Sequence, residues 1–72
     1  MREKGIVREF ERGYGWIRPS AGGSAIFVHY NNIDMRGFKK LEAGDVVEYF
    51  TEHGERGHYA ANVKLIQSAE AA

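Results

Sequence analysis

Aromatic side chains recur at alternate positions in two short runs of this 72-residue chain. The first run, residues 12–17, is Arg-Gly-Tyr-Gly-Trp-Ile, and the second, residues 26–30, is Ile-Phe-Val-His-Tyr. If both runs are strands, side chains two apart share a face, so Tyr14 lies beside Trp16 and Phe27 beside His29. Flat rings on an open sheet can stack on the unpaired bases of a single strand, at roughly 1–3 kcal/mol per base. The spacing therefore predicts a surface that binds unpaired bases.

An antiparallel hairpin would bring these two runs together. Gly22–Gly23 lies between them and permits the positive φ angles of a tight reversal. The opposite faces of the runs must then fill the core, and these carry Ile17, Ile26, Val28 and Tyr30. The alternative buries the aromatic rings and leaves the aliphatic residues exposed beside glycines that have nothing to pack, so we favour outward-facing rings.

The two runs resemble the paired ribonucleoprotein-type motifs of the cold-shock domain family. The similarity continues through residues 5–8, 37–39, 41–47 and 54–63, and it covers about residues 5–65. It implies an all-β fold, a five-stranded antiparallel OB-fold barrel over residues 1–66, with a short tail at 67–72 that we expect to fray. It also implies a cytoplasmic protein that binds single-stranded RNA or DNA with low sequence selectivity, as a passive RNA chaperone or cold-shock-type regulator.

The resemblance and the ring positions together define the candidate site. The rings expected to stack on bases are Tyr14, Trp16, Phe27, His29 and Phe38, and the cations expected to contact phosphates are Arg8, Arg12, Lys39 and Arg56. Phe10 has two possible positions, at the edge of this surface or packed in the core. Phe38, in a polar loop, is either a mobile stacking ring or an anchor on the barrel.

The first strand departs from the family pattern. Glu9 stands where the family usually has a stacking tryptophan, and only Glu11 and Arg12 precede Gly13, about two residues fewer than usual. A carboxylate repels phosphate and cannot stack on a base. Trp16, where the family usually has phenylalanine, restores some stacking area. We expect a binding surface shifted away from this strand and weaker affinity than that of a typical member.

The other elements follow from the same alternation. The first strand, near residues 5–10, should be irregular because Ile6, Val7 and Phe10 cannot share one face. Ile6 is the inward candidate, and Val7 is either a core residue or the start of a bulge. We expect Ala60–Ala61 to close the barrel against the first strand. The remaining predicted core residues are Ile33, behind a 3₁₀ turn, and Val47 and Tyr49 in the fourth strand.

Composition limits the function classes. Ten Lys and Arg balance ten Asp and Glu, so the basic excess typical of duplex binders is missing and stacking must contribute more than counterion release. The chain has no cysteine, and its three histidines lack zinc-site spacing. We therefore expect no enzyme, metal, cofactor, small-molecule substrate or membrane span, and a monomer or a strand-swapped dimer. The competing hypothesis is a protein-interaction barrel that uses the same aromatic patch.

Overall fold

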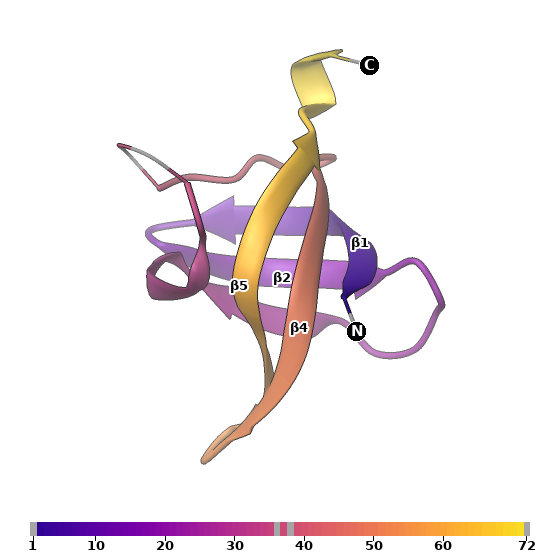
Figure 1. Cartoon of the computed structure of the whole chain (residues 1–72), viewed down its shortest axis with the longest axis vertical. Helices are drawn as coiled ribbons and strands as arrows, with labels where there is room; N and C mark the ends of the chain where they lie inside the picture. The colour runs from indigo at the N-terminus through magenta and orange to yellow at the C-terminus, as the bar shows by residue number, and fades with distance from the viewer. Residues whose placement is uncertain (1, 36, 38, 72) are drawn as a thin grey trace.

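A computed structural model describes residues 2–35, 37 and 39–71, so the prediction for Phe38 lies outside the described residues. The strands are β1 (Glu3–Glu11), β2 (Tyr14–Pro19), β3 (Ile26–His29), β4 (Val46–Gly54) and β5 (Gly57–Gln67), with two 3₁₀ helices, η1 (Tyr30–Asn32) and η2 (Ala69–Ala71). The strands close into a barrel in the order β1-β2-β3-β5-β4. Figure 1 shows β4 and β5 crossing steeply over β1, β2 and β3. The predicted all-β, five-stranded barrel is confirmed, with one difference: β3 meets β5 in parallel, whereas the other four pairings are antiparallel.

The barrel core is built from inward-facing positions of every strand. The expected aliphatic set Ile17, Ile26 and Val28 is buried, and Ile33 is buried behind η1. Val47 and Tyr49 are buried as predicted. The rest of the core comprises Val7, Leu41, Ala60 and Val63. Burial, reinforced by the nearby Glu3 carboxylate, raises the pKa of Tyr49.

The predicted irregularity of β1 is a bulge, and it places Val7 rather than Ile6 in the core. Val7 is paired with Ile17 and Glu9 with Trp16, so β1 advances two residues while β2 advances one. Ile6 is 45% exposed, which makes its predicted inward orientation wrong. The reason is the inward position of Gly5, where a Cβ atom would lie 2.5 Å from Cγ2 of Ile17. Because side chains alternate, Gly5 and Val7 face the core and Ile6 faces out.

The predicted closure of β5 against β1 is also wrong. Ala60 and Ala61 pair with Thr51 and Phe50 of β4, and β1 pairs with the opposite edge of β4. A second irregularity lies at Asn62, whose φ is +52° and which interrupts the register between β4 and β5. The residues that β5 buries completely are therefore three apart, Ala60 and Val63, rather than two.

The segment after β5 is held to the barrel rather than frayed at its start. Asp45 is only 4% exposed, and its carboxylate accepts hydrogen bonds from the backbone N–H groups of Glu42 at 2.9 Å and Ala69 at 2.7 Å. One buried carboxylate thus fixes both the turn before β4 and the entry into η2. Figure 1 shows η2 projecting beyond the end of the barrel.

Candidate nucleic-acid interface

The four predicted rings of β2 and β3 form one outward surface, here called the aromatic face (Tyr14, Trp16, Phe27 and His29). Tyr14 pairs across the strands with His29, and Trp16 with Phe27. Tyr14 is 49% and Trp16 38% exposed, while the other two are half-buried. The Phe27 centroid lies 5.5 Å from that of Trp16, edge to face, and 6.0 Å from that of Tyr14. The alternative in which these rings are buried is therefore excluded.

The glycine between Tyr14 and Trp16 sets how closely β1 and β2 approach. A Cβ atom at Gly15 would lie 2.7 Å from Cα of Phe10 and would overlap the carbonyl oxygen of Glu9. The backbone of β1 therefore occupies the space that a side chain at position 15 would need, so only glycine fits between Tyr14 and Trp16.

Tyr30 extends the aromatic face, contrary to its predicted inward position. The strand ends at His29, whose Nδ1 accepts a hydrogen bond at 3.3 Å from the N–H of Asn31 at the start of η1. The chain turns there, Tyr30 is 45% exposed, and its ring centroid lies 4.5 Å from that of His29. The sequence pattern predicts Tyr30 inward because alternation extended to residue 30 places it on the face of Ile26 and Val28, whereas the strand ends at His29. The Asn31–Asn32 turn signal marks where the alternation stops.

The hydrogen bond at Nδ1 also defines the chemistry of His29. A neutral imidazole that accepts at Nδ1 carries its proton at Nε2. The exposed edge of the ring then presents an N–H donor, which can bond to an acceptor on a base. His29 therefore offers both a flat surface and one directed polar group.

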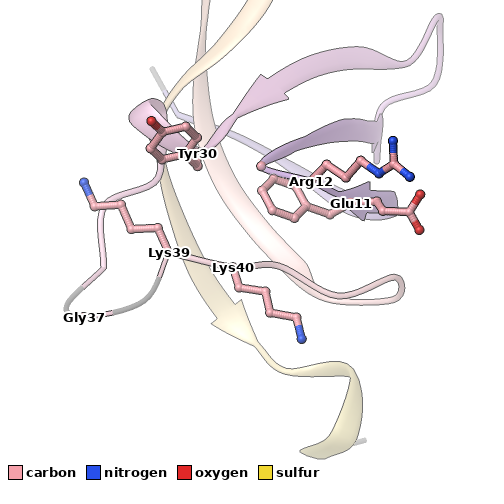
Figure 2. Close-up of a pocket in the computed structure, with 8 residues that line it drawn as sticks. Glu11, Arg12, Tyr30, Gly37, Lys39 and Lys40 are labelled. Atoms are coloured by element: carbon pink, nitrogen blue, oxygen red, sulfur yellow. The ribbon is translucent and has the colours of Figure 1, made fainter.

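A basic pocket of about 830 Å³ lies at the Tyr30 end of the aromatic face. Figure 2 shows the β1–β2 turn on one side of it and the loop that follows η1 on the other. The lining residues are Phe10, Glu11, Arg12, Gly13, Tyr30, Gly37, Lys39 and Lys40. The lining carries three cations and one carboxylate, an excess of positive charge that favours a phosphate group. The structure thus brings the predicted Arg12 and Lys39 together, and Phe10 both packs on the core and lines the pocket.

A second pocket of about 640 Å³ borders the other end of the aromatic face, beside Trp16 and Phe27. Its far wall is the β4–β5 turn, which includes Arg56. The imidazoles of His53 and His58 pack edge to face at the base of that turn, with centroids 4.1 Å apart. Arg56 is therefore placed where its cation can reach a strand that lies across Trp16.

Arg8 is the predicted cation that lies in neither pocket. Its guanidinium contacts the carboxylate of Glu9 at 3.1 Å, and both side chains are more than half exposed. An exposed ion pair of this kind contributes little to stability. Because both side chains remain more than half exposed, Arg8 stays accessible to a ligand.

Within residues 2–35, 37 and 39–71, no cluster of three His, Asp or Glu side chains has the arrangement of a metal site. In the same described part of the chain, no helix is long and apolar enough to span a membrane.

In the β1–β2 turn, Arg12 supplies a positive charge to the basic pocket, but its backbone conformation is one that destabilises the fold. This combination leads to a testable prediction. Arg12 and Gly13 have φ of +59° and +90°, values at which asparagine is tolerated but arginine is strained. We expect Arg12→Asn to raise the free energy of unfolding by about 1 kcal/mol, or roughly 4–8 °C in Tm for a domain of this size. The same variant should bind oligonucleotide more weakly, with the salt slope reduced by about 0.7.

Thermal melting and salt titration measure both effects of this substitution. Arg12→Lys is the matched control, since it keeps the charge and the strained backbone, and both properties should then stay near those of the wild type. An unchanged Tm in Arg12→Asn would show that the turn is not strained.

Comparison with known proteins agrees with this geometry. The family model described as the 'Cold-shock' DNA-binding domain matches residues 3–66. The cold shock-like protein of Thermotoga maritima is 42% identical over 66 residues, which cover 89% of this chain and 98% of that protein. The cold shock-like protein CspD of Escherichia coli K12 is 39% identical over 67 residues, 90% of each chain.

A solved structure described as drosophila Unr CSD456 superimposes with a TM-score of 0.79 at 21% identity. The match covers 92% of this chain and 27% of that one, and it supports the barrel fold. The chain therefore belongs to the cold-shock domain family of nucleic-acid-binding domains, as the family model and the two relatives show and as the outward aromatic face agrees.

Proposed function

We propose that this protein binds single-stranded RNA or DNA across the aromatic face, with successive bases stacked on its rings. The observation that carries the proposal is the continuous outward surface of Tyr14, Trp16, Phe27 and His29, prolonged by Tyr30. A duplex keeps its bases stacked on one another, so such a surface favours unpaired strands. Rings accept any base, so sequence selectivity should be low outside particular polar contacts.

The two pockets supply the electrostatic part of the site. Arg12, Lys39 and Lys40 surround the basic pocket at one end of the aromatic face, and Arg56 borders the pocket at the other end. A strand that crosses the rings can place phosphates at both ends. The excess of cations at the first pocket would let a chain of zero formal net charge contact phosphate there, whereas Arg56 shares the second pocket with Glu55.

The cellular role that fits such binding is that of a passive RNA chaperone or cold-shock-type regulator in the cytoplasm. A protein that binds only the open strand draws a folded RNA toward that state by mass action. No catalytic step or cofactor is needed. A monomer suffices, since one aromatic face and its two pockets come from a single chain.

The test is a titration of Trp16 fluorescence with heptathymidine, heptauridine and a duplex of equal length. Trp16 is the only tryptophan, so the signal reports the aromatic face directly. We expect quenching by both single strands and much weaker binding of the duplex. If three or four phosphates are contacted, log K should fall with log salt at a slope of about −2 to −3. No response at high micromolar oligonucleotide would reject the proposal and favour a protein partner for the same patch.

A further inference from the structure

The bulge in β1 places two charged side chains beside Trp16 on the aromatic face. Consecutive residues of a regular strand point to opposite sides, so neighbours cannot pair through their side chains. Arg8 and Glu9 nevertheless form an ion pair at 3.1 Å, because at this bulge both residues oppose the single residue Trp16. Their side chains are 58% and 62% exposed, so both are open to a ligand.

Glu9 is the directly paired neighbour of Trp16. Residues paired across antiparallel strands have Cβ atoms about 4.5–5.5 Å apart and share a face. A base stacked on the indole of Trp16 would therefore extend its edge toward the Glu9 carboxylate. The Arg8 guanidinium donates a hydrogen bond to that carboxylate at 3.1 Å, which limits the directions in which the carboxylate can turn.

The chemistry of this pair matches one base better than the others. An ionised carboxylate only accepts hydrogen bonds, and it accepts best from two parallel donors. Guanine presents two such donors on one edge, N1–H and the N2 amino group, next to the acceptor O6. Uracil and thymine offer a single donor, N3–H. Arg8 can donate to O6 while Glu9 accepts from N1 and N2.

We propose that Glu9, oriented by Arg8, selects guanine at the base position over Trp16. The inference rests on the proposed function, since it assigns a base preference to one position of the same site. A bidentate contact of this type discriminates against a wrong base by about one order of magnitude or more. Because both side chains are more than half exposed, we expect about tenfold, the lower end of that range.

The experiment is a guanine scan of heptathymidine. Seven oligonucleotides, each with one guanine in place of a thymine, are titrated against the wild type, Glu9→Gln and Glu70→Gln. At one position the wild type should bind the guanine oligonucleotide about tenfold more tightly than heptathymidine. Inosine at that position, which lacks the N2 amino group, should remove most of this tenfold increase in affinity. Glu9→Gln should reduce the preference to threefold or less while binding heptathymidine more tightly, because a charge that repels phosphate is removed.

Glu70→Gln is the matched control, with the same loss of charge in η2, beyond the barrel. It should keep the tenfold ratio, and thermal melts confirm that each variant is folded. A guanine preference below twofold at every position, with heptathymidine still bound, overturns the inference and leaves the proposed function standing. A preference that survives Glu9→Gln also overturns it, since another group must then recognise guanine. Failure of every oligonucleotide to bind rejects the proposed function itself.

Discussion

Replacing Trp16 by alanine is expected to weaken binding of heptathymidine by roughly 5- to 150-fold, or about 1–3 kcal/mol. Trp16 has the largest ring of the aromatic face, touches Phe27 edge to face at 5.5 Å and borders the pocket that contains Arg56. Its loss removes one stacking platform and the contact that orients a second. Because the variant lacks the fluorescent reporter, the measurement is the anisotropy of a labelled oligonucleotide or calorimetry.

The control for this prediction is Ile66→Ala. Ile66 is 45% exposed, so its truncation removes apolar surface of similar exposure, but it lies on β5 and outside the aromatic face. Its affinity should equal that of the wild type within about twofold. Trp16→Phe should recover most of the lost affinity, since a smaller ring still stacks. Wild-type affinity in Trp16→Ala would mean that the oligonucleotide binds elsewhere on the barrel.

Gly15→Ala is expected to destabilise the fold by more than about 3 kcal/mol, a large share of the roughly 4–11 kcal/mol expected for a domain of this size. The added methyl group would meet the Glu9 carbonyl and lie 2.7 Å from Cα of Phe10. These obstacles are main-chain atoms, so no change of rotamer relieves the overlap. The β1–β2 pairing at the bulge would have to open, and circular dichroism melts would show a large fall in Tm or no folded state.

The contrast for this substitution is Gly22→Ala in the β2–β3 loop. A Cβ atom at Gly22 would meet nothing within 4 Å, although φ there is +95°. The cost should be that of the left-handed backbone alone, about 1–2 kcal/mol. If Gly15→Ala has the same Tm as Gly22→Ala, then β1 can shift to make room for the methyl group. In that case close packing against the β1 bulge does not require glycine at position 15.

The sidedness of the aromatic face could be predicted from the sequence. Ile17, Ile26 and Val28 alternate with Trp16 and Phe27, and only one of the two faces can be buried in so small a barrel. A period of two is a local property, so it needs no knowledge of the rest of the chain. The glycines at the turns and the buried Ile33 followed from equally local signals.

The errors lie where that period breaks. Ile6 faces out because Gly5, not Ile6, fits against Ile17 and Tyr49, and Tyr30 faces out because η1 begins immediately after His29. Ala60 and Ala61 pair with β4 rather than with the first strand, and Asn62 adds a residue to β5 just after them. Each case depends on contacts with a strand or helix whose position the local sequence does not specify.

The sequence by itself determined that Tyr14, Trp16, Phe27 and His29 face outward, because alternation and the need to bury aliphatic side chains leave one consistent arrangement. Tyr30 joins them only through the turn into η1. Only the tertiary structure decided which charges accompany those rings. The β1 bulge puts Arg8 and Glu9 beside Trp16, and the fold places Arg12 and Lys39 on two sides of one pocket (Figure 2). Bulges and closure depend on pairing between strands distant in the chain, so their outcome is fixed only when the whole barrel has assembled.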